Sequence, residues 1–233
     1  MKIALCMSGY VGYTNQFKVG SIDSQDSKPL PIEIAYKTIK KYLIQDYDVD
    51  TYVHSWDVER EKDILDTYKP KKCVMEKQKG EEDGILDSRY SQWYSRSEVL
   101  NLALKSKIKY DFYMLTRFDL AFGINFPFDK LDNKNLYVAG AERWTELNDV
   151  YFLSGAEMMK HISKFFSSGL GNYKVGNQQG NYPGGAHWEI GKYCRDYLRE
   201  NGGKVCYIGS DAPPEMNIAF VRNLELDEKI WKI

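Results

Sequence analysis

The sequence has almost no net charge, few cysteines and no long apolar run. Its 32 Lys and Arg residues nearly cancel its 33 Asp and Glu residues. No basic field is therefore present to hold nucleic acid or an anionic membrane by charge alone. The four cysteines show no CxxC spacing, which favours reduced thiols over disulfides or a zinc site. This balance favours a small-molecule partner and argues against nucleic acid.

Targeting segments and familiar phosphate motifs are missing as well. Only about five apolar residues precede Ser8, too few for a signal peptide or a spanning helix. We therefore expect a soluble, cytoplasmic protein without membrane insertion. Neither GxGxxG nor GxxxxGK[ST] occurs, which counts against a Rossmann dinucleotide site and a P-loop kinase. No Pro, Gly or Ser-rich linker divides the 233 residues, so we expect a single domain.

What the sequence does contain is an alternation of short apolar runs and amphipathic stripes. The runs predict strands at residues 3–7, 50–54, 72–75, 112–115, 135–139, 150–153 and 205–208. Stripes with a spacing of 3.6 residues predict helices that begin at Pro31, Ser91, Gly155 and His187. This order indicates an α/β fold with a mostly parallel central sheet and helices on both faces. Residues 169–185 hold six glycines, a composition typical of a long functional loop.

The segment from Tyr110 to Asp119 joins a strongly apolar strand to an Arg-x-Asp. Arg117 and Asp119 are expected at the carboxyl end of this strand, where open α/β sheets bind ligands. Two residues apart on an extended chain, their side chains project from the same side. One interpretation is a surface ion pair. The other is a diphosphate site, because a guanidinium matches phosphate oxygens and a strand-end aspartate suits a hard divalent cation.

Polar residues also follow two other predicted strands at the same edge. Ser8 and Gly9 end the first strand, where they either allow a nucleotide to approach the backbone closely or only form a turn. His54 and Asp57 end the second strand. Two ligands are too few for a metal site, and a structural role is therefore favoured for His54.

The helix that begins at Ser91 crowds four further polar residues into its first turns, namely Gln92, Tyr94, Ser95 and Arg96. Capping explains Ser91. It does not explain the others, which together with the positive end of the helix dipole suit a phosphate or a base edge. Elsewhere, Asp149 precedes a strand, and His187 and Glu189 open the last helix. Their side chains fit general bases or purely structural roles equally well.

The order of these motifs resembles the small GT-A-type glycosyltransferases of large DNA viruses and bacterial surface-polysaccharide loci. The resemblance spans nearly the whole chain and rests on residues 2–9, 53–57, 91–95, 110–111, 117–119, 148–149 and 187–189. It implies a GT-A-like, Rossmann-like sheet, a nucleoside-diphosphate sugar as donor, with a UDP-sugar favoured, and a glycan acceptor. In that fold class an Asp-x-Asp coordinates the diphosphate through Mn²⁺ or Mg²⁺. Here Arg117 occupies the position of the first Asp of that pattern, which leaves open whether a metal ion is needed.

The resemblance also implies roles for single residues. Arg117 would contact the diphosphate and Asp119 the metal or the ribose. The nucleotide side would be formed by Ser8, Gly9, Gln92, Tyr94, Ser95 and Arg96. Glu189 or Asp149, with His187 as a lesser candidate, would deprotonate the acceptor if the enzyme inverts. Two other classes stay open, a non-catalytic module on the same fold that binds a glycan or a protein, and a nucleotidyltransferase.

Overall fold

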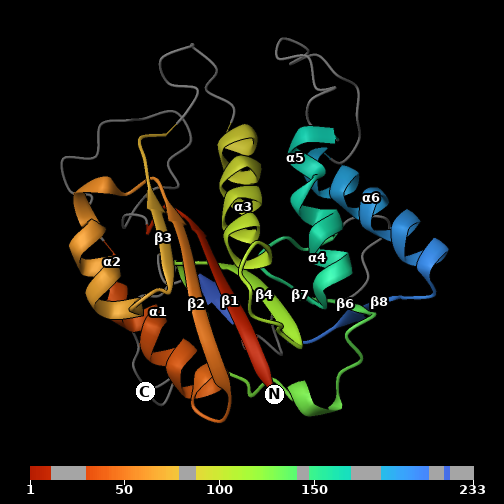
Figure 1. The fold of residues 1–233 in the computed structure, drawn as a ribbon, viewed down its shortest axis with the longest axis horizontal. Helices are drawn as coiled ribbons and strands as arrows, with labels where there is room; N and C mark the ends of the chain where they lie inside the picture. Colours follow the sequence, from red (N-terminus) through yellow and green to blue (C-terminus); the bar gives the residue numbers. More distant parts are fainter. Residues whose placement is uncertain (12–29, 79–87, 141–146, 169–184, 210–217, 221–233) are drawn as a thin grey trace.

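The computed structural model describes residues 1–11, 30–78, 88–140, 147–168, 185–209 and 218–220, with the backbone alone at 88–90, 185–189 and 219–220. The strands of the main sheet are β1 (Lys2–Gly9), β2 (Asp48–Ser55), β3 (Lys72–Met75), β4 (Phe112–Arg117), β6 (Leu136–Val138), β7 (Phe152–Ser154) and β8 (Val205–Tyr207). They are ordered β3-β2-β1-β4-β7-β6-β8 (Figure 1). The expected α/β fold with a mostly parallel sheet is confirmed.

One strand departs from the parallel arrangement. β1 runs parallel to β2 and β4, β2 to β3, and β6 to β8, whereas β7 is antiparallel to both of its neighbours. β6 and β7 are neighbours in the sheet and are also consecutive along the chain. Parallel neighbours such as β1 and β2 need a crossover, here through α1 (Ile32–Ile39).

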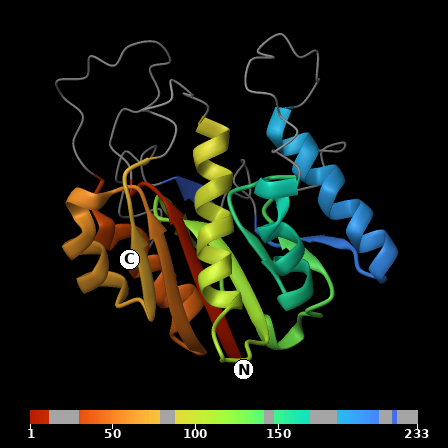
Figure 2. The same ribbon diagram turned by 45° about the horizontal axis from the view of Figure 1, so that its top comes forward.

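Helices cover both faces of the sheet, as expected. On one face lie α1, its π-helical continuation η1 (Lys40–Ile44), α2 (Glu61–Tyr68) and a small sheet of β5 (Leu120–Phe122) and β9 (Ile218–Phe220). On the other lie α3 (Ser88–Leu104), α4 (Ala156–Ser163) and α6 (Gly185–Asn201), with the short α5 (Phe165–Ser168). Figures 1 and 2 show α3 lying along the central strands with α4 and α6 beside it.

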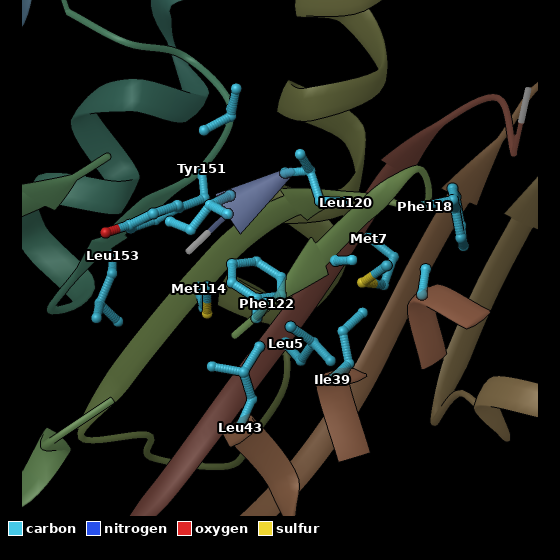
Figure 3. Packing of buried hydrophobic residues seen from close by; sticks show 14 of the residues in the cluster. Leu5, Met7, Ile39, Leu43, Met114, Phe118, Leu120, Phe122, Tyr151 and Leu153 are labelled. Atoms are coloured by element: carbon cyan, nitrogen blue, oxygen red, sulfur yellow. The ribbon is translucent and has the colours of Figure 1, made fainter. Parts of the chain in front are cut away.

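β1 is an unbroken apolar run from Ile3 to Met7, and its side chains are buried on both faces of the sheet. Leu5 and Met7 face α1, where they pack with Ile39 and Phe118 (Figure 3). Cys6 faces α3 in the opposite cluster. Each fully buried aliphatic side chain contributes roughly 1.5–3 kcal/mol relative to exposure. Burial on both faces therefore fits the place of β1 inside the sheet, between β2 and β4.

Several elements have no counterpart among the sequence predictions. α2 buries only Ile64 and Tyr68, too few positions for a periodic signal. β5 pairs with β9 over three residues from distant parts of the chain, and local sequence carries no information on such a pairing. α3 and α6 begin at Ser88 and Gly185, before the predicted Ser91 and His187. The predicted loop at 169–185 lies outside the described residues except for Gly185.

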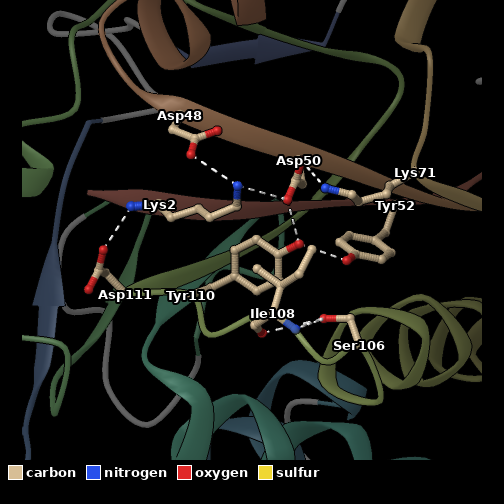
Figure 4. Close-up of polar contacts among 9 residues, drawn as sticks. All are labelled: Lys2, Asp48, Asp50, Tyr52, Lys71, Ser106, Ile108, Tyr110 and Asp111. Atoms are coloured by element: carbon tan, nitrogen blue, oxygen red, sulfur yellow. Dashed lines mark hydrogen bonds and ion pairs between the residues drawn. The ribbon is translucent and has the colours of Figure 1, made fainter.

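A polar network joins the strands at the amino edge of the sheet (Figure 4). Tyr110 Oη donates to Asp50 Oδ2 at 2.7 Å and lies 2.7 Å from Tyr52 Oη. Lys71 Nζ donates to Asp50 Oδ1 at 2.8 Å, and Lys2 Nζ lies 3.4 Å from Asp50 Oδ2. These contacts tie β1, β2 and β4 together at the end opposite the predicted site. None of the described helices is both long enough and apolar enough to cross a membrane.

Candidate functional site

The strand order reverses between β1 and β4. From β1 the chain proceeds to β2 and β3 on one side, and β4 lies on the other side of β1. Such a switch point is where open α/β sheets bind ligands, outside the carboxyl ends of the strands. The register places Ser8 of β1 opposite both His54 of β2 and Arg117 of β4. The polar residues at the three strand ends are therefore adjacent at this point.

The backbone leaves the extended conformation at Gly9, the last residue of β1. Gly9 has a φ of 95°, a conformation that residues with a Cβ rarely adopt. A Cβ at Gly9 would meet no described atom within 4 Å, so the glycine is required by the turn and not by crowding. Its N–H donates to Ser95 Oγ at 2.9 Å, and its carbonyl accepts from Ser55 Oγ at 2.8 Å. The turn is thus held by side chains of both β2 and α3.

Ser95 belongs to a chain of buried hydrogen bonds. Ser95 Oγ lies 2.8 Å from His54 Nδ1, and His54 Nε2 lies 3.0 Å from Glu76 Oε1. Because a carboxylate only accepts, the proton on Nε2 is assigned to the bond with Glu76. In this neutral tautomer Nδ1 accepts from the Ser95 hydroxyl, which itself accepts from the Gly9 N–H and also lies 3.4 Å from the His54 carbonyl oxygen.

This chain has the residue types of an activated nucleophile, a serine beside a histidine that a carboxylate orients. Ser95 and His54 are fully buried, however, and the hydroxyl is used to hold Gly9. The arrangement therefore fits a structural anchor, the role predicted for His54. Glu76 was not predicted. Its one signal is its position directly after β3, at the carboxyl edge.

Arg96 and Asp149 form a second buried group. Arg96 Nη1 donates to Asp149 Oδ2 at 3.0 Å, and its Nη2 donates to the Asp149 carbonyl at 2.6 Å. Gln92 Nε2 donates to the same Oδ2 at 2.8 Å. The guanidinium is 2% exposed and lies 4.6 Å from the Trp93 ring centroid. Burial lowers the pKa of Arg96, against the opposing effect of Asp149. Asp149 is thus the counter-ion of a desolvated arginine.

Arg117 and Asp119 form a bidentate ion pair. Arg117 Nε donates to Asp119 Oδ1 at 2.8 Å, and Arg117 Nη2 donates to Oδ2 at 2.9 Å. The Arg117 side chain is 25% exposed and that of Asp119 only 4%. Burial opposes the charged form of Arg117, but the carboxylates of Asp119 and Asp149 together outweigh burial, and the pKa of Arg117 is raised. Arg117 is thus the more exposed member of the pair, and Asp119 is buried.

The described residues at this position do not fit a divalent cation. Mg²⁺ and related hard cations take several oxygen ligands, usually including carboxylates. Here both Asp119 oxygens accept from Arg117, whose positive charge would repel a cation. Among the described residues, no group of three or more His, Cys, Asp or Glu side chains could hold a metal ion. We therefore derive no step through a metal.

Aromatic rings and a third aspartate lie at the same edge. Tyr94, half-buried, stacks on Trp56 with ring centroids 5.5 Å apart and meets His54 edge-on at 5.7 Å. Asp57 is buried and accepts the Val11 N–H at 3.1 Å. Burial raises the pKa of Asp57 against this hydrogen bond. Its position after β2 was the sequence signal for it.

Most of the predicted site residues thus gather at the carboxyl edge. The group that the structure brings together comprises Ser8, Gly9, Gln92, Tyr94, Ser95, Arg96, Arg117, Asp119 and Asp149. His187 and Glu189 fall in the first turns of α6, but their side chains lie outside the described residues.

Comparisons with known proteins assign no family to this chain. No protein-family model matches it, and a search of curated proteins finds no similar sequence. The functional argument therefore rests on the switch point of the sheet and on the side chains gathered there.

Proposed function

We propose that the protein is a glycosyltransferase that moves a sugar from a nucleoside-diphosphate sugar to a hydroxyl of a glycan acceptor. The observation that carries this proposal is the partly exposed Arg117 at the switch point, opposite Ser8 in the register. Ligands of open α/β sheets bind at such points, and a guanidinium fork matches diphosphate oxygens. The motif order that resembles GT-A-type enzymes supports a sugar nucleotide over other diphosphates.

In this proposal Arg117 binds the leaving diphosphate. Negative charge grows on the phosphate oxygens as the bond to the sugar breaks, and a preorganised cation stabilises that charge. Gly9 gives the nucleotide close access to the backbone at the end of β1. Tyr94, beside Trp56, is assigned to the nucleotide side as well.

Three residues of α3 take a supporting part. The Ser95 hydroxyl holds Gly9, and the amide of Gln92 and the guanidinium of Arg96 hold Asp149. These donors are used within the protein, so we assign the three residues to positioning the edge instead of contacting the nucleotide directly.

The base that deprotonates the acceptor is assigned to Glu189 for an inverting reaction. Asp149 Oδ2 already accepts from Gln92 and Arg96, which fits a counter-ion better than a proton acceptor. Glu189 is in the helix that begins after residues 169–184, and His187 is the lesser candidate. A positioned general base contributes about 10²–10⁴-fold to a rate.

The test is release of nucleoside diphosphate from a panel of UDP- and GDP-sugars supplied with glycan acceptors. Glu189→Gln is expected to slow release by about 100-fold or more. Glu200→Gln, the same change at an exposed position near the end of the same helix, serves as the control and is expected to leave the rate unchanged. No release from any donor by the unaltered protein would contradict the proposal.

A second candidate is a non-catalytic module that binds a glycan or a protein on the same fold. This candidate is favoured because Asp119 and Asp149 are each paired with an arginine. The carboxylates of both residues are therefore already engaged within the protein. It predicts binding without release of nucleoside diphosphate, so detectable turnover would exclude it. Pyrophosphate release from a nucleoside triphosphate would instead indicate a nucleotidyltransferase.

A further inference from the structure

We infer that the diphosphate is bound at this edge by Arg117 without a divalent cation, and that Asp119 is a positioning residue that orients the Arg117 guanidinium. The inference deepens the proposed function and rests on it. In the Asp-x-Asp pattern the residue at the position of Asp119 would bind a metal ion. Here the Asp119 carboxylate instead binds and orients the Arg117 guanidinium.

The first support is the geometry of the pair. Two parallel N–H···O bonds of 2.8 and 2.9 Å use both oxygens of Asp119. A bidentate contact fixes the plane of the guanidinium as well as its position. Arg117 is the last residue of β4 and Asp119 lies two residues beyond it, so the end of a central strand defines where the pair lies.

The second support is the difference in burial. Asp119 is almost fully buried, whereas a quarter of the Arg117 side chain is exposed. A ligand that approaches the edge therefore meets the guanidinium before the carboxylate. A metal ion would have to separate the pair, which would leave a largely buried guanidinium close to a second cation. Both consequences are unfavourable where charges are poorly solvated.

The third support is the neighbouring pair of Arg96 and Asp149. The two pairs are close enough for Asp149 to act on the charge of Arg117 and for Asp119 to act on that of Arg96. A metal site would draw two nearby carboxylates together. Here each carboxylate is bound to its own arginine, which is the arrangement expected where arginine provides the positive charge for an anion.

The experiment is titration calorimetry of the full chain with uridine diphosphate and guanosine diphosphate. Each nucleotide is titrated first in EDTA and then with added Mg²⁺ or Mn²⁺. We expect the affinity of the unaltered protein for the better nucleotide to agree within about twofold between these conditions. An affinity that falls tenfold or more in EDTA would overturn the inference.

Three variants separate the roles of the two residues. Arg117→Lys keeps the charge but loses the fork, and Asp119→Asn keeps the shape but loses the carboxylate. Each is expected to weaken binding in EDTA by about tenfold, with no recovery when metal is added. Asp132→Asn, at an exposed position outside this edge, is expected to bind as the unaltered protein does. Circular dichroism verifies that each variant is folded.

The outcomes distinguish the inference from the function on which it rests. Binding that requires metal, and that loses its metal dependence in Asp119→Asn, would overturn the inference and leave a glycosyltransferase in place. If neither nucleotide binds under any of these conditions, both the inference and the proposed function are overturned. Metal-independent binding that Arg117→Lys and Asp119→Asn weaken supports the inference.

Discussion

At the scale of single residues, two serines of α3 that are two residues apart differ in their partners. Ser95 Oγ accepts from Gly9 and lies 2.8 Å from His54 Nδ1. Ser97 Oγ is buried as well, but it has no hydrogen-bond partner among the described residues. A buried group that loses its partner costs about 1–3 kcal/mol, whereas removing an unsatisfied group costs little or stabilises. The two hydroxyls should therefore respond differently to the same substitution.

We predict that Ser95→Ala lowers the free energy of unfolding by about 1–3 kcal/mol, because it leaves the Gly9 N–H and His54 Nδ1 without this partner. Ser97→Ala is the matched control and is expected to be neutral or slightly stabilising. Urea denaturation measures both. Equal losses for the two variants would show that the hydrogen bonds to Ser95 carry no special weight.

The residue scale also shows what sequence could predict of the site. The apolar run predicted that Arg117 and Asp119 lie at the carboxyl end of a strand. Arg117 is the last residue of β4, opposite Ser8 in the register, and Asp119 lies in the turn that follows. Their spacing left an ion pair and a ligand site as alternatives. Which residues become hydrogen-bond partners depends on how the ends of different strands approach each other in the folded chain. Glu76 meets His54 from the end of another strand, and no local pattern connects those two residues.

At the scale of elements, two adjacent glycines end α6 for different reasons. Gly202 has a φ of 73° and open space around its Cα among the described atoms, as in a helix C-cap. A Cβ on Gly203 would lie 2.5 Å from the Lys134 carbonyl oxygen and 2.7 Å from Leu198 Cδ2. Gly203 is thus required by the close approach of the chain that precedes β6.

We predict that Gly203→Ala destabilises the protein by about 1–3 kcal/mol, because backbone atoms must move apart. Gly202→Asn is the control, since asparagine tolerates a left-handed conformation, and its cost is expected to be smaller. Thermal denaturation of both variants measures the difference. A larger loss for Gly202→Asn would contradict this account of the end of α6.

The packing of α4 against α6 has a titratable component. The His161 ring stacks on Tyr193 with ring centroids 3.9 Å apart, and Tyr197 lies on it at 4.2 Å. Burial lowers the pKa of His161 below its ordinary value of 6.5, against the hydrogen bond with the Tyr193 carbonyl. Between the lowered value and 6.5 the unfolded chain binds more protons. Stability contributed by neutral His161 is therefore present above pH 6.5 and is lost as the pH falls through the lowered pKa.

We predict that His161→Phe, which retains a stacking ring, loses part of the stability difference between pH values above and below 6.5. Denaturation midpoints of the variant and the unaltered protein across this range provide the measurement. Parallel pH profiles for the two proteins would indicate that His161 does not contribute to the acid sensitivity of the fold.

At the scale of the whole molecule, the sequence predicted the α/β class because β1, β2 and β4 are apolar runs with helical stripes between them. It did not predict that β7 runs antiparallel, since strand direction depends on the connection and not on composition. The pairing of β5 with β9 was beyond reach for the same reason. The site follows from the strand order, because only the reversal between β1 and β4 makes their carboxyl ends a ligand edge.

The measurement that tests the central claim most directly is a crystal structure with uridine or guanosine diphosphate bound. We predict diphosphate oxygens within hydrogen-bond distance of the Arg117 guanidinium, outside the carboxyl ends of β1 and β4, with Asp119 still paired to Arg117. A nucleotide bound at another part of the molecule would contradict the claim that this switch point is the functional site.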